Sequence, residues 1–276
     1  MTLIPDIEWC EVPAGEFIMG SDSDNSWQSD EKPQHTLNLP YSYKAAKYPI
    51  TNAQYELFVE AGGYGERRYW TEAGWAEKEK PTWGDKQPWT GPRNYGEPFN
   101  LANHPIIGVS WYEAVAYCRW LTEVMRDCGM LAEGWQIRLP TEAEWEKAAR
   151  GVDGQIYTWG NEFDLEKANS METEVESTSA VGIFTDGVSS YGCHEMAGNV
   201  WEWCATKVSY GNYKPYPYKI ENEWTEAYLE GNSYKTLRGG SWVNEADNLR
   251  CAYRLSNNPD LNSNNRGLRC FFVPIF

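Results

Sequence analysis

The segments Leu237-Arg-Gly-Gly-Ser-Trp242 and Gly267-Leu-Arg-Cys270 bound the most informative stretch of this sequence. Eight residues in and between them are of types that shape a backbone or brace a loop, and we call them the frame: Gly239, Gly240, Trp242, Arg250, Arg254, Pro259, Gly267 and Arg269. Seven asparagines lie among them, at positions 244, 248, 257, 258, 262, 264 and 265. So much Asn fits neither a helical period nor a strand alternation and favours exposed turns. The stretch therefore has the layout of a binding surface, in which a structured frame displays polar, changeable side chains.

The composition bounds the fold and the partners. A chain of 276 residues with 41% hydrophobic residues can bury a sizeable core, and we expect one domain over residues 1–276. Its 15 Trp and 18 Tyr indicate an irregular, loop-rich fold, in which flat amphipathic rings pin loops to the core. The net charge of −16 argues against nucleic acid and anionic membranes as partners and is compatible with a monomer.

The cysteines and the N-terminal sequence predict a cytoplasmic protein. Seven cysteines, an odd number without a C-x-x-C pair, are typical of reduced thiols. The three histidines lie at no zinc-ligand spacing from a cysteine pair. The first nine residues lack the basic and apolar regions of a signal peptide, and no apolar run is long enough to cross a bilayer.

Local signals predict three helices and few other regular elements. Thr51 or Asn52 caps a helix that ends at Glu60. Capping boxes at 110–113 and 141–144 open two more, which end near Met125 and at Arg150. Residues 16–20 are expected to form a strand, residues 64–105 a long packed loop, and the chain beyond Gly160 loops with short strands.

Seven motifs in order along the chain resemble the sulfatase-modifying-factor family, the domain of the formylglycine-generating enzymes. They are Phe17-Ile-Met-Gly20, Pro49-Ile-Thr-Asn52, Gly108-Val-Ser-Trp-Tyr-Glu113, Arg138-Leu-Pro-Thr-Glu-Ala-Glu-Trp145, Tyr157-Thr-Trp-Gly160, Gly198-Asn-Val-Trp-Glu-Trp203 and Arg238-Gly-Gly-Ser-Trp242. The resemblance implies an α+β fold, the C-type lectin-like fold of that family, which is loop-rich with short strands and a few helices. Fold alone does not settle function, which depends on the site.

The residues that would carry the family's oxidative chemistry are missing or isolated. Formylglycine-generating oxidases hold copper with two cysteines just after the Gly-Gly-Ser-aromatic motif, and thiolates suit Cu(I) where amides do not. The matching segment here, residues 243–248, contains no cysteine, and Cys251 is interpreted as a buried structural thiol. The sulfoxide-forming relatives use an iron-binding histidine triad supplied partly by another domain. We therefore expect no catalytic residues and no enzymatic activity.

The tail resembles, more specifically, the variable proteins of prokaryotic diversity-generating retroelements. Such proteins end in a variable repeat in which mutated adenine-rich Asn codons yield unrelated residues among residual asparagines. The resemblance implies a variable region at about 241–270, here with Leu268 where Phe is common. It also implies nine variable, ligand-binding positions: Val243, Glu245, Asp247, Tyr253, Leu255, Ser256, Asp260, Leu261 and Ser263. The alternative is a plain lectin-like domain with a solvated Asn-rich loop.

A structural calcium ion is a further implication of the family resemblance. It would be held by the carboxylates of Glu195 and Glu202 and by the carbonyls of Gly198 and Val200, since hard oxygen ligands suit Ca²⁺. Alternatively, Asn199 and Glu202 only form hydrogen bonds that fix this loop. No other cofactor is expected.

The sequence thus predicts a ligand-binding protein whose stiff scaffold presents a diversified surface to a protein or another macromolecule. Tyr253 and Trp242 would supply rigid contact area, and Glu245, Asp247 and Asp260 would favour a basic patch on the partner. Arg250 and Arg254 would brace loops. The alternatives are a formylglycine-generating-type oxidase and an accessory sensory or scaffold domain with an invariant partner.

Overall fold

Short strands and a few helices make up the fold, as the α+β prediction requires. The computed structural model describes residues 3–22, 29–80, 88–208, 216–220 and 223–275. The helices are α1 (Asn52–Glu60), α2 (Glu72–Lys78), α3 (Trp111–Asp127), α4 (Glu142–Arg150) and α5 (Glu226–Leu229), and the 3₁₀ turns are η1 (Ser29–Glu31), η2 (Arg67–Tyr69), η3 (Leu165–Lys167), η4 (Met171–Thr173) and η5 (Ala246–Leu249). The strands are β1 (Trp9–Val12), β2 (Gly15–Met19), β3 (His35–Leu39), β4 (Tyr43–Ala46), β5 (Trp135–Arg138), β6 (Trp201–Val208), β7 (Tyr234–Arg238), β8 (Leu255–Asn257), β9 (Arg266–Gly267) and β10 (Phe271–Pro274).

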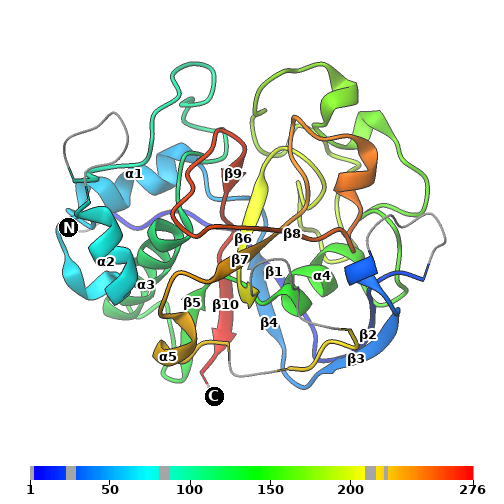
Figure 1. The fold of residues 1–276 in the computed structure, drawn as a ribbon, viewed down its shortest axis with the longest axis horizontal. Coiled ribbons are helices and arrows are strands. Elements are labelled where there is room, and N and C mark those ends of the chain that lie inside the picture. The colour runs from blue at the N-terminus through cyan, green and yellow to red at the C-terminus, as the bar shows by residue number, and fades with distance from the viewer. Residues whose placement is uncertain (1–2, 23–28, 81–87, 209–215, 221–222, 276) are drawn as a thin grey trace.

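Two four-stranded sheets organise these elements. One has the order β1-β4-β10-β5 with antiparallel neighbours, so the last strand of the chain lies between two earlier ones. The other has the order β8-β7-β6-β9 and carries the C-terminal tail, with β9 parallel to β6. A hairpin of β2 and β3 stands apart from both. Helices α1 to α3 lie to one side of the central strands, and α4 with the β2–β3 hairpin lies to the other (Figure 1).

Helix α3 confirms its predicted start and fills the larger core. The Ser110 hydroxyl accepts from the Glu113 N–H, and the Glu113 carboxylate accepts from the Ser110 N–H, which completes the capping box. The apolar residues Trp111, Val115, Cys118, Leu121 and Met125, which are three to four positions apart, are buried, but so are Tyr112, Tyr117 and Trp120. The helix is therefore enclosed by aromatic neighbours, because strands pack against one face while α1 and its following loop cover another.

Helix α4 is also where it was predicted, and it is enclosed along its whole length. Thr141 forms the capping box with Glu144. All nine of its residues are buried, including three glutamates, a lysine and an arginine. Buried charges need partners, and Lys147 donates to the carbonyls of Pro13 (2.7 Å) and Gly15 (2.9 Å). The glutamates are paired with arginines, which ties the tail to this helix.

The remaining predictions were partly right. The strand predicted at 16–20 is β2, at Gly15–Met19, and the helix predicted from Thr51 is α1, capped by Thr51 and completed by Gln54. The loop predicted at 64–105 contains α2, capped by Thr71, which was missed because its seven residues show no clear period. Beyond Gly160 the described chain has short elements apart from the eight-residue strand β6. Within the described residues, no helix has the length and apolar character that crossing a bilayer requires.

Candidate functional site

The frame arginines of the tail are held in buried ion pairs. Arg254 binds Glu142 of α4 through Nε (2.9 Å) and Nη2 (2.7 Å), and Arg250 binds Glu31 through Nη1 (2.8 Å) and Nη2 (3.0 Å). Both carboxylates are fully enclosed. This confirms that the two arginines brace the loop, and it shows how: each one attaches the tail to an element far away in the sequence.

Two further arginines extend the same scheme. Arg269 donates to Glu202 on β6, with its Nη2 at 2.7 Å from Oε1. Arg238, just before the glycine pair, binds Glu146 of α4 and donates to the carbonyls of Ala252 and Tyr253. Four buried Arg–Glu pairs therefore fix the backbone of the tail at both ends and in the middle.

The glycine pair has a specific steric role. Gly239 and Gly240 both have positive φ, +96° and +74°, a region that disfavours other residues. A Cβ on Gly240 would lie 2.7 Å from the Leu249 side chain and 3.0 Å from the Asn248 carbonyl. The chain can therefore turn back against η5 only without a side chain at this position.

None of the nine predicted variable side chains is buried. Glu245 and Leu261 are exposed, and the other seven are partly exposed: Val243, Asp247, Tyr253, Leu255, Ser256, Asp260 and Ser263. The frame residues between them are buried, except Trp242, which is half-buried. We call these nine residues the display surface. Their role in binding stays a prediction, but their burial separates them cleanly from the frame.

The acidic residues of the display surface differ in how free their carboxylates are to bind a basic partner. Asp247 is engaged by Arg250, with Oδ1 at 2.7 Å from Nε. Asp260 has one carboxylate oxygen enclosed without a hydrogen-bond partner, and burial raises its pKa. The exposed carboxylate of Glu245 is the one best placed for a basic partner.

Residues outside the tail extend this surface, and the sequence did not reveal them. The Tyr95 hydroxyl donates to the Asn262 carbonyl at 2.7 Å, and the Phe99 ring packs against Trp242 at 5.5 Å between centroids. Tyr95 and Phe99 also line a cavity of about 260 Å³, together with Arg93. These residues come from the loop region 64–105, which has no period that could have pointed to a site.

Arg266 is a second residue that the sequence did not single out. It lies on β9, and its Nε and Nη1 are enclosed without a hydrogen-bond partner. Its guanidinium lies 6.0 Å from the Trp203 ring centroid. The signal that could have marked it was a lone arginine directly after the last asparagines of an acidic chain.

The predicted calcium ligands lie on the loop before β6 and, in the case of Glu202, on β6 itself, and they are unequally suited to an ion. Glu195 is buried, its Oε1 accepts from the Gly182 N–H (2.7 Å), and its Oε2 is enclosed without a partner. Burial, above all, raises the pKa of Glu195 to about 7. A cation would satisfy this orphaned oxygen, so Glu195 fits a calcium ligand.

Glu202 does not fit that role, because its carboxylate is already used. It accepts from Arg269 and from the Trp145 Nε1 (2.6 Å). The Gly198 N–H donates to the Gly239 carbonyl, and the Val200 N–H to the Gly198 carbonyl. Among the described residues, no three His, Cys, Asp or Glu side chains are arranged to hold a metal. The calcium ion stays a prediction that rests on Glu195.

All seven cysteines are free thiols. Cys251 is fully buried, as predicted, and burial raises its pKa to about 12. The Sγ atoms of Cys118 and Cys270 lie 3.7 Å apart in the core. A thiol with a raised pKa carries little thiolate near neutral pH and is a poor nucleophile or metal ligand, so Cys251 packs as a small apolar residue.

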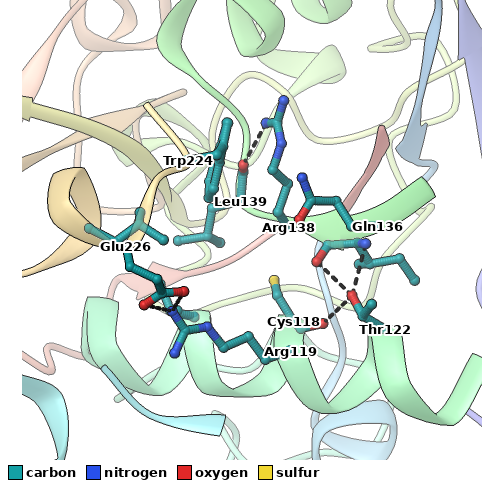
Figure 2. Close-up of a pocket in the computed structure, with 11 residues that line it drawn as sticks. Cys118, Arg119, Thr122, Gln136, Arg138, Leu139, Trp224 and Glu226 are labelled. Carbon is teal, nitrogen blue, oxygen red and sulfur yellow. Dashed lines mark hydrogen bonds and ion pairs between the residues drawn. The ribbon is translucent and has the colours of Figure 1, made fainter. Parts of the chain in front are cut away.

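A separate pocket is lined by residues of α3, β5 and the segment around α5 (Figure 2). It has a volume of about 140 Å³ between α3, β5 and the segment around α5. Trp224, Leu139 and Leu229 contribute apolar surface, and a salt bridge joins Arg119 to Glu226 at 2.8 Å. In Figure 1, α5 and β5 lie in the lower part of the molecule, below β8 and β9. None of the nine display-surface residues lines this pocket.

Comparison with known proteins identifies the family. Residues 7–272 match the domain family described as sulfatase-modifying factor enzyme 1-like. The chain belongs to this family. This sulfatase-modifying factor domain has the predicted C-type lectin-like fold of the formylglycine-generating type, a prediction that the family match confirms. Treponema denticola variable protein 1 shares the fold, with a TM-score of 0.63 over 95% of this chain and 94% of that protein at 20% identity.

Two curated relatives show the functional range of sulfatase-modifying factor domains. Hercynine oxygenase of Mycolicibacterium smegmatis is 30% identical over 90% of this chain and 57% of its own length. Inactive C-alpha-formylglycine-generating enzyme 2 of Mus musculus is 30% identical over 94% of this chain and 83% of its own length. The chain spans about half the length of the hercynine oxygenases that it matches.

These relatives correct one prediction. The sequence was taken to exclude enzymatic activity because residues 243–248 lack the cysteine pair, and this prediction is wrong. Relatives that match about nine-tenths of the chain at 30% identity are named as oxygenases. The missing cysteines bear on one copper chemistry and do not separate the enzymes of the family from its other members.

Proposed function

We propose that residues 241–270 form a diversified ligand-binding region, whose nine display-surface side chains contact a protein or another macromolecule. The observation that carries the proposal is the division of burial within the tail. Side chains that fix the backbone are enclosed and ion-paired, whereas those between them reach the surface. A fold tolerates arbitrary changes only where side chains are not packed in the interior.

The geometry supports binding by a rigid surface. Tyr253 packs on Trp201, with ring centroids 5.9 Å apart, while part of its ring stays exposed. A tyrosine held in this way offers contact area with little loss of side-chain entropy. The remaining asparagines and serines can adapt their hydrogen bonds to different partners.

A randomised library tests the proposal. The nine display-surface codons are varied together in a phage-displayed protein, and the surviving clones are selected first for protease resistance. They are then panned against lysozyme, a basic probe protein, and ovalbumin, an acidic one. We expect a large share of clones to resist protease and some of them to bind a probe specifically.

The matched control is a library varied at the eight frame positions, which is expected to yield few protease-resistant clones. Equal survival of the two libraries, or no binder from the display-surface library, would contradict the proposal. Diversification itself is tested by sequencing the gene from one population. Differences should concentrate at the nine codons and at the Asn codons, beside a template copy and a reverse transcriptase gene.

A further inference from the structure

Arg266 differs from Arg238, Arg250, Arg254 and Arg269 because it is largely enclosed without an acidic partner. Its Nε and Nη1 donate to no acceptor, and no ion pair with it exists among the described residues. Burial lowers the pKa of Arg266, but a guanidinium stays charged at any physiological pH. Enclosing a charge without a partner destabilises the folded protein, so an anion bound to Arg266 would stabilise it.

A second arginine lies close by. Arg93 is exposed, forms no ion pair among the described residues, and its guanidinium lies 5.0 Å from the Tyr95 ring centroid. Burial raises the pKa of Tyr95, and the positive charges of Arg93 and Arg266 oppose this rise. Two unpaired positive charges therefore act on the same phenol, in a protein whose net charge is −16.

Backbone hydrogen bonds join this cluster to the tail. The Arg93 N–H donates to the Gly108 carbonyl (2.9 Å), and the Gly108 N–H donates to the Ser263 carbonyl (3.1 Å). Tyr95 donates to Asn262. Arg93 and Tyr95 also line the cavity of about 260 Å³, which gives a ligand room to approach; Glu56 lines it too but pairs with neither arginine.

We infer that Arg93, Tyr95 and Arg266 form a carboxylate-binding site at the edge of the display surface, and that it accepts an acidic side chain or the C-terminus of a protein ligand. This inference rests on the proposed function for the identity of the ligand. A planar carboxylate matches the paired donors of a guanidinium. A phosphate dianion would meet stronger repulsion from the acidic molecule. Together with the exposed Glu245, the surface would select a ligand by charges of both signs.

Acetate is the probe. The Arg Nε–Hε signals of the ¹⁵N-labelled protein are followed while sodium acetate is added, with sodium chloride holding the ionic strength constant. The Arg266 signal, assigned from its loss in Arg266→Lys, should move and saturate with acetate and stay still with acetamide. Arg93→Gln should weaken acetate binding about tenfold, which corresponds to roughly 1.4 kcal/mol. Arg68→Gln, a change at another exposed arginine, should have no effect.

Three results would contradict the inference. An unmoved Arg266 signal, an equal response to acetamide, or a response to inorganic phosphate without one to acetate would overturn the carboxylate site. Repeating the titration on a variant with all nine display-surface residues changed to Ser or Ala separates the two proposals. Acetate should still bind to this nine-fold variant. The arginine site can therefore be measured even if the display surface binds no ligand, and the display-surface library can be tested even if acetate does not bind.

Discussion

Arg254 and Glu142 are both fully enclosed although 112 residues separate them in the sequence. Ionic partners of this kind help stability little in comparison with a well-packed apolar pair, but losing one of them leaves a bare charge in the interior. The pair therefore acts as a fixed point, which holds the start of β8 against α4 whatever the neighbouring exposed residues are.

Arg254→Met is expected to lower the free energy of unfolding by about 3–5 kcal/mol, because the enclosed Glu142 carboxylate loses its guanidinium partner. Adding Glu142→Leu should recover much of this loss, since no charge then remains. Urea unfolding of the three proteins measures both changes. A double variant no more stable than Arg254→Met would show that the loss does not come from the bare charge.

Glu195 makes stability depend on pH. Its folded-state pKa, about 7, lies above the ordinary value of 4.5, so the folded protein keeps a proton that the unfolded chain releases. Stability should therefore fall as the pH rises from about 4.5 to 7. With a chelator present, Glu195→Gln should remove roughly 2–3 kcal/mol of this loss. Thermal unfolding from pH 5 to 8 compares the two proteins, and Glu113, whose pKa is also raised to about 7, is unchanged in both.

The same residue decides the calcium prediction. At pH 8, calcium should raise the melting temperature of the wild type relative to a chelator, because an ion that binds only the folded state stabilises it. The rise should be absent in Glu195→Gln. Identical melting curves of the wild type with calcium and with chelator would leave Glu195 without an ion.

At the scale of elements, Gly240 and η5 depend on each other. A Cβ added to Gly240 would lie too close to the side chain of Leu249, the last residue of η5. Gly129 offers a matched comparison: its φ of +72° is nearly the same as that of Gly240, but a Cβ there would meet no atom within 4 Å.

Gly129→Ala should therefore cost only the strain of a positive φ, about 1–2 kcal/mol. Gly240→Ala carries the same strain and also forces η5 away, so its cost should be clearly larger. Chemical unfolding of both variants gives the difference. Equal losses would mean that η5 yields freely and does not fix the residues before it.

Helix starts were predictable because their signals are local. Ser110 with Glu113 and Thr141 with Glu144 each lie within four residues and satisfy backbone donors that any helix must satisfy. The burial of α4 was not predictable, because the arginine partners of its glutamates come from β5, the tail and its own last turn. The prediction of Glu202 as a calcium ligand failed for the same reason. Its local sequence matches a calcium motif, but the fold brings Arg269 to its carboxylate from far along the chain.

At the scale of the molecule, the residues proposed to vary and the residues that hold the fold occupy different places. The exposed tail positions could be predicted from a texture of asparagines and unrelated residues. Arg93 and Arg266 could not, because the feature that distinguishes them is the absence of a partner in three dimensions. Trp242 was placed in the frame as a core residue, but it is half-buried and rests on Phe99.

Changing all nine display-surface residues to Ser or Ala should keep the fold and lower the melting temperature only moderately. Exposed substitutions each shift stability by about 0.5 kcal/mol or less, and the partly buried Tyr253 and Leu255, which pack on the core, should account for most of the loss. Trp203→Ala is the contrasting variant: its fully buried ring should cost about 3–5 kcal/mol. Trp242→Ala should fall between them. Circular dichroism on heating measures the melting temperatures of all three variants. Unfolding of the nine-fold variant at room temperature would show that its residues belong to the core.

The position of β10 has a consequence for how altered copies are screened. This strand is made after residues 241–270, yet it lies between β4 and β5 and pairs with both. A copy whose message acquires a stop codon or a shifted reading frame in that region lacks the strand, so two edges that should be covered stay open and prone to aggregation. If residues 241–270 are diversified as proposed, we therefore expect a chain that is not translated correctly through this region to fold poorly and to be degraded by proteases.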